Sequence, residues 1–68
     1  MTYIEKLLEF NKTLKGENAT EILKDIDTRL WNIKMVDRWT KKDKETFDML
    51  CDLERIYNEI EEKENERN

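Results

Sequence analysis

Apolar residues recur along the chain at intervals of three and four residues, the spacing of amphipathic α-helices. The first stripe consists of Tyr3, Leu7, Phe10 and Leu14. The second stripe consists of Ile22, Leu23, Ile26, Leu30 and Ile33. The third stripe consists of Leu50, Leu53, Tyr57 and Ile60. Because each stripe can form one buried face of a helix, the pattern predicts three helices.

Polar residues mark where these helices begin. Three capping boxes occur, at Thr2–Glu5, Asn18–Glu21 and Thr40–Asp43. In a capping box, two side chains three residues apart satisfy free backbone N–H groups at the start of a helix. Gly16 marks the end of the first helix, whereas no Gly or Pro marks the end of the second. We therefore predict helices at about residues 3–15, 19–38 and 41–62, followed by an acidic tail at 63–68 that frays because it has no apolar anchor.

The predicted fold is all-α, with one helical domain over residues 1–62. Short connections favour antiparallel neighbours, so we expect a small antiparallel three-helix bundle. A second arrangement has the same spacing: a long hairpin of the second and third helices that dimerises, with the first helix packed across it. The apolar spacing alone does not separate the two arrangements.

Composition restricts the chemistry available to the chain. Its 68 residues are 37% hydrophobic and 44% charged, so one thin core is the most it can build. There is no His, one Cys and one Gly, which excludes His-based triads and metal sites, internal disulfides and glycine-rich phosphate loops. No His is present to activate Cys51 as a nucleophile. We therefore expect no enzyme activity, no metal and no cofactor.

The predicted second helix carries apolar residues on two opposite sides. At about 100° per residue, Trp31, Met35 and Trp39 lie near 140°, 180° and 220° from Ile26, and Arg38 lies beside them near 120°. In a straight helix these residues form a ridge that a three-helix core cannot cover. Three alternatives remain open: the helix stops near Met35 and Trp39 turns back into the core, the helix kinks, or the other two helices flank it on different sides.

Charge is distributed unevenly along the chain. Residues 28–47 carry a net charge of +3, whereas residues 48–68 carry −5. Lys41, Lys42 and Lys44 lie in the first turn of a predicted helix, where cations are mildly unfavourable, which favours an acidic partner. Nucleic-acid binding by the basic middle segment is less favoured, because the bases on the second helix are scattered and the whole chain has a charge of −4.

We therefore expect a non-enzymatic helical regulator or inhibitor that binds a protein partner, as small acidic products of phages and mobile elements often do. The expected partner-binding residues are Trp31, Met35, Arg38 and Trp39, with Lys41, Lys42 and Lys44 as a steering rim. The alternatives are a homo-oligomeric structural protein, in which the ridge packs against its own copy, and a nucleic-acid-binding module.

The first residues contain no apolar run typical of a signal peptide, and no stretch reaches the length needed to cross a membrane. A cytoplasmic protein, acting as a homodimer or in a hetero-complex, is the expectation.

Overall fold

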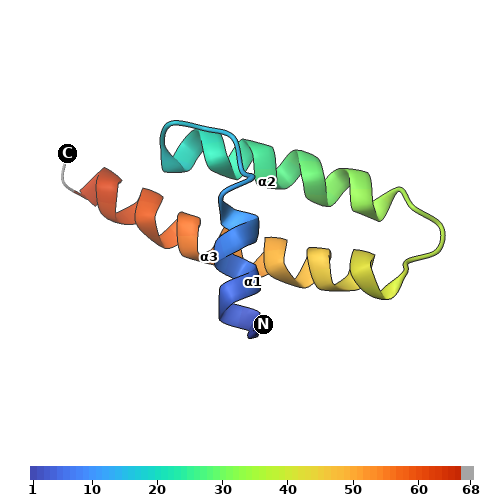
Figure 1. Ribbon diagram of the computed structural model, residues 1–68. Coiled ribbons are helices and arrows are strands. Elements are labelled where there is room, and N and C mark those ends of the chain that lie inside the picture. Colours follow the sequence, from blue (N-terminus) through green and yellow to red (C-terminus); the bar gives the residue numbers. More distant parts are fainter. Residues whose placement is uncertain (67–68) are drawn as a thin grey trace.

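The computed structural model describes residues 1–66, which contain three α-helices and no strand. Helix α1 spans Tyr3–Asn11, α2 spans Ala19–Lys34 and α3 spans Lys41–Glu66. Helices α2 and α3 run antiparallel as a hairpin, and the short α1 lies across it (Figure 1). The predicted all-α, three-helix fold is confirmed. None of the helices within residues 1–66 is both long and apolar enough to cross a bilayer.

All three helices begin at the predicted caps. The hydroxyl of Thr2 and the side-chain oxygen of Asn18 each accept a hydrogen bond from the backbone N–H three residues later, at 3.2 Å and 2.9 Å. At the start of α3, the N–H of Asp43 donates to the Thr40 hydroxyl at 3.2 Å, and the N–H of Thr40 donates to the Asp43 carboxylate at 3.0 Å. These bonds satisfy backbone donors that a helix start otherwise leaves free.

Helix α1 ends earlier than the sequence predicts, at Asn11 instead of residue 15. Both the backbone N–H and the hydroxyl of Thr13 donate to the Phe10 carbonyl, at 2.9 Å and 2.7 Å. These bonds join residues three apart instead of four, so the α-helix ends here. Leu14 then packs against the core. Gly16 therefore lies within the connection between α1 and α2 instead of capping α1.

Helix α2 also ends early, at Lys34 instead of residue 38, as the early-stop alternative predicts, although Trp39 stays 41% exposed instead of entering the core. The backbone N–H of Val36 donates to the Ile33 carbonyl at 3.0 Å, and the indole N–H of Trp39 donates to the same oxygen at 2.9 Å. This carbonyl is one of the four at a helix end that lack a partner within the helix. Two donors from the turn satisfy it, and the chain reverses toward α3.

The core lies between α2 and α3, around Ile26, Leu30, Leu50 and Leu53. Within residues 1–66, only Ile26 and Leu50 are large side chains that are fully buried. Burying such a side chain contributes about 1.5–3 kcal/mol. Helix α1 and the connection after it add partly buried residues to the edge of this cluster, among them Leu7, Phe10 and Leu14. The core is therefore as thin as the composition predicts.

Polar contacts tie α1 to α3 at both of its ends. The cross-helix contacts are Tyr3–Asp52, Lys6–Glu45 and Asn11–Tyr57. The Tyr57 hydroxyl donates to the Asn11 amide oxygen at 2.6 Å. The hydrogen bond that the Tyr3 hydroxyl donates to Asp52, together with desolvation and neighbouring carboxylates, raises the pKa of Tyr3 to about 12. These contacts orient α1 across the hairpin.

Helix α3 continues to Glu66, four residues beyond its predicted end. The predicted fraying of residues 63–68 stays a prediction, and residues 67 and 68 lie outside the part of the chain that the structure describes.

Candidate protein-binding surface

Four large apolar side chains are exposed at the end of the hairpin where α2 turns into α3. Trp31 is 63% exposed, Met35 66%, Val36 45% and Trp39 41%. We call Trp31, Met35, Val36 and Trp39 the turn patch. Trp31 belongs to the last turn of α2, Met35 caps that helix, and the other two lie in the turn that follows. This end of the hairpin lies at the right of Figure 1.

The structure places two of the four predicted ridge residues, Trp31 and Met35, on one helical line. Trp31 and Met35 lie one helical turn apart and face solvent, as the helical period predicts. Because α2 ends at Lys34, Trp39 does not continue that line four residues further on. Arg38 also lies in the turn, so the angle that places it beside Trp31 and Met35 on a continuous helix no longer applies. Arg38 is exposed, and so are Lys41 and Lys42, whereas Lys44 is exposed one turn into α3.

Trp39 supports the turn with one side of its ring. Its indole N–H donates to the Ile33 carbonyl. The centroid of its ring lies 4.9 Å from the centroid of the Phe47 ring, with an angle of 41° between the two planes. Tilted aromatic pairs at this separation are favourable beyond the area that they bury. Trp31 makes no hydrogen bond through its indole N–H to any residue in the described range. Trp39 therefore has a structural role on one side, whereas Trp31 has none that the contacts reveal.

A rim of bases follows the turn patch. All four predicted rim and flank residues are exposed, and none forms an ion pair with the residues that the structure describes: Arg38, Lys41, Lys42 and Lys44. Asp43, which lies among them, is held by the helix cap. These cations are therefore free to meet acidic groups from outside the chain.

Two residues of this surface were not predicted. Val36 would lie near the edge of the buried stripe if the second helix continued, whereas in the structure it lies exposed in the turn after α2. Phe47 lies three residues before Leu50 on α3, so it continues the apolar spacing of that helix, and it packs against the core. Nothing in the periodicity indicates that it contacts Trp39, because that contact depends on the path of the turn.

Two ionisable groups of α3, Cys51 and Glu54, have raised pKa values. Desolvation raises the pKa of Cys51, and the nearby carboxylate of Glu54 raises it further. The thiol is therefore protonated at neutral pH, which makes it a weak nucleophile. Desolvation, with a hydrogen bond and charge repulsion from Asp27, also raises the pKa of Glu54. Within residues 1–66, no group of three or more His, Cys, Asp or Glu side chains is arranged to hold a metal ion.

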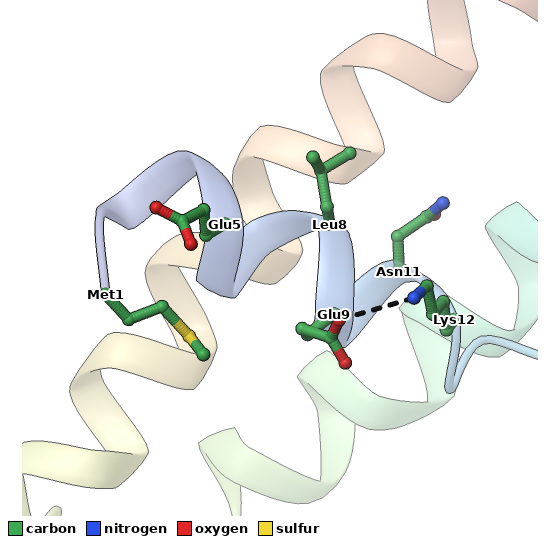
Figure 2. Close-up of a pocket in the computed structure, with 6 residues that line it drawn as sticks. All are labelled: Met1, Glu5, Leu8, Glu9, Asn11 and Lys12. Carbon is green, nitrogen blue, oxygen red and sulfur yellow. Dashed lines mark hydrogen bonds and ion pairs between the residues drawn. The ribbon is translucent and has the colours of Figure 1, made fainter.

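A shallow hollow of about 370 Å³ lies on the outer side of α1 (Figure 2). It is lined by Met1, Glu5, Leu8, Glu9, Asn11 and Lys12. Its polar groups already have partners within the chain: Glu9 pairs with Lys12 at 3.3 Å, and Asn11 accepts from Tyr57. The hollow therefore has few free polar groups with which to orient a small molecule.

Comparisons with known proteins identify no relative of this chain. No known protein family, no curated protein and no solved structure matches it. The functional proposal therefore depends on the chemistry of the turn patch and its rim.

Proposed function

We propose that this chain is a non-enzymatic regulator or inhibitor that acts by binding a protein partner through the turn patch. The observation that carries the proposal is the exposure of Trp31 and Met35, at 63% and 66%, although only two large side chains within residues 1–66 are fully buried. A domain with so thin a core gains most from burying these side chains itself. It leaves both side chains mostly in contact with water.

The residue types of the turn patch suit a protein interface. Trp is among the residues most enriched at the energetic centres of interfaces, and Met adapts its shape to irregular partners. The lysines and the arginine beside the patch add long-range attraction, which mainly accelerates association. A partner that fits this surface has an apolar centre and acidic residues around it.

Binding can be tested with a matched pair of variants. Trp31→Ser removes a 63% exposed side chain from the turn patch, and Ile4→Ser removes an equally exposed side chain from α1. Because both residues are exposed, each variant should change the free energy of unfolding by less than about 0.5 kcal/mol. Wild type and both variants are tagged, and each is used as the bait in a pull-down from an extract of the source cell.

The expected result is a protein that wild type and Ile4→Ser capture equally and that Trp31→Ser loses. Reconstitution of that complex from purified components should show a loss of about 2 kcal/mol or more for Trp31→Ser. A partner that is retained by Trp31→Ser would contradict the proposal. Binding to DNA that disappears with added salt would favour the nucleic-acid alternative instead.

A further inference from the structure

A second exposed apolar surface lies at the opposite end of the hairpin. Ile56 and Ile60 lie one turn apart on α3 and are 42% and 39% exposed. We call Ile56 and Ile60 the α3 end patch. Exposed carboxylates accompany it on the same helix: Glu59, Glu62, Glu64 and Glu66. An acidic helix with an apolar pair at this spacing has the features of a helix that docks on another protein.

The end of α3 extends past the rest of the hairpin. The Thr20 hydroxyl, in the first turn of α2, donates to the Glu61 carboxylate at 2.7 Å. Residues 62–66 therefore lie beyond the start of α2, and Figure 1 shows this end of α3 projecting from the molecule. The projecting turn begins two residues after Ile60, the second residue of the α3 end patch.

The two patches are surrounded by opposite charges. Residues 34–44, around the turn patch, contain five basic and two acidic side chains. Residues 54–66, around the α3 end patch, contain six acidic and two basic side chains. Each patch therefore provides what the other requires: an apolar centre with a rim of the opposite sign.

The two patches face opposite sides of the hairpin. On α2, Arg29 reaches the α1 side, where it contacts Thr13 and the ring of Phe10, and Trp31 lies about 200° further around the helix. On α3, Asp52 contacts α1, and Ile56 lies only about 40° around the helix from it. The α3 end patch is therefore on the side of α1, and the turn patch is on the side away from it.

We propose that the turn patch is covered by the α3 end patch of a second copy of this chain. The proposal rests on the proposed function, because it uses the same patch. As the two patches differ in both end and side, one pair of copies cannot join both patches at once across a two-fold axis. The contact is head-to-tail, so each added copy leaves one patch of each kind free, and assembly grows with concentration unless a ring closes. A foreign partner must then compete with a second copy for the turn patch.

The test uses sedimentation velocity from about 1 µM to about 500 µM in low salt, a range that brackets affinities typical of small interfaces. Wild type should grow in mass with concentration, and added NaCl should oppose that growth because the rims attract each other by charge. A turn variant, Trp31→Ser with Met35→Ser, and an end variant, Ile56→Ser with Ile60→Ser, should each stay monomeric. Ile4→Ser should associate as wild type does.

The decisive sample is an equimolar mixture of the turn variant and the end variant. Each supplies the patch that the other lacks, so the mixture should form a one-to-one dimer that grows no further. A mixture that stays monomeric would overturn the proposal, as would monomeric wild type at every concentration. If a variant fails to fold by circular dichroism, charge reversal provides the same test: Glu59→Lys with Glu62→Lys should weaken association roughly tenfold or more. Lys41→Glu with Lys42→Glu on the other copy should restore it.

Failure of this proposal can be distinguished from failure of the proposed function. Monomeric wild type that still captures a foreign protein through Trp31 removes the second copy as the occupant and keeps the binding function. Head-to-tail association without a foreign partner that depends on Trp31 keeps the second copy as the occupant and removes the foreign-partner function.

Discussion

The two connections between helices hold their positions by different chemistry. In residues 12–18, the Arg29 guanidinium donates to the hydroxyl and the carbonyl of Thr13, at 2.9 Å and 2.6 Å. It also pairs with Asp25 at 3.1 Å, and that carboxylate accepts the backbone N–H of Lys15 at 3.0 Å. In residues 35–40, a single indole has the equivalent role, because Trp39 bonds to the end of α2 and packs against α3.

The difference between the connections concerns what each leaves exposed. The first connection contains one large apolar residue, Leu14, which packs against the core. The second needs only one side of Trp39, yet it exposes Met35 and Val36 and lies beside Trp31. The contacts of Arg29 with Thr13 and Asp25, which we call the Arg29 clasp, show that this chain can fix a connection without exposing apolar surface. We therefore interpret the excess apolar surface at the second turn as a binding surface.

The largest expected effect is in the first connection. Gly16 has a φ of 151°, and a Cβ at this position would lie 2.7 Å from the Ile22 backbone nitrogen. Gly16→Ala combines backbone strain with a clash against the start of α2, so it should lower the free energy of unfolding by about 3 kcal/mol, as measured by urea denaturation. The exposed neighbour provides the control: Lys15→Ala should cost less than about 0.5 kcal/mol. Equal costs for both would mean that the connection does not depend on Gly16.

In the second connection, Trp39→Ala should cost about 2 kcal/mol, which is less than full burial of an indole would give, because the ring is half exposed. Trp39→Phe preserves the contact with Phe47 and removes only the bond to Ile33. It should cost about 1 kcal/mol. The measurement is again the urea midpoint. If Trp39→Phe costs as much as Trp39→Ala, the hydrogen bond and not the ring packing holds this turn.

Removal of the positive charge from the Arg29 clasp should lower the free energy of unfolding by a smaller amount. Arg29→Met keeps an unbranched apolar side chain and removes the guanidinium, which donates to Thr13 and lies over the ring of Phe10. Because Arg29 and Asp25 are only partly buried, we expect a loss of about 1 kcal/mol. The cost should fall in 1 M NaCl, whereas the cost of Trp39→Phe should not change. A cost that is independent of salt would place the contribution of Arg29 in its packing.

The smallest effect concerns Glu54, which touches neither connection and serves as a reference. Its pKa is raised in the folded state, so the folded chain holds this proton more tightly than the unfolded chain does. This contribution to stability is complete below the ordinary glutamate range and is lost as pH rises through the raised value. Glu54→Gln should therefore be slightly more stable than wild type at pH 7 and lose that advantage near pH 4. An advantage that grows toward acid pH would reverse the sign and contradict this view.

Helix starts could be predicted from the sequence, whereas helix ends could not. A start depends on two residues three positions apart, such as Thr40 and Asp43, and their side chains act locally. The end of α2 depends on the Trp39 indole, which donates back to the Ile33 carbonyl. The end of α1 combines the bonds from Thr13 to the Phe10 carbonyl with the packing of Leu14 against the core. The contacts of Trp39 and Leu14 depend on the path of the chain beyond each helix, which apolar spacing does not encode.

The same distinction applies to the turn patch. The exposure of Trp31 and Met35 follows from their angle on the helix relative to Ile26, so it could be predicted. The exposure of Val36 and the contact between Trp39 and Phe47 follow from where α2 stops. They become visible only once that end is known.

The unequal surroundings of the two indoles also give the molecule a built-in optical reporter. The chain contains no other tryptophan, so its indole emission comes from Trp31, which is 63% exposed, and from Trp39, which is 41% exposed and contacts Phe47. Iodide should quench the first ring more than the second. A titration that shields the first ring reports docking, and one that unshields the second reports opening of the turn, with no dye attached.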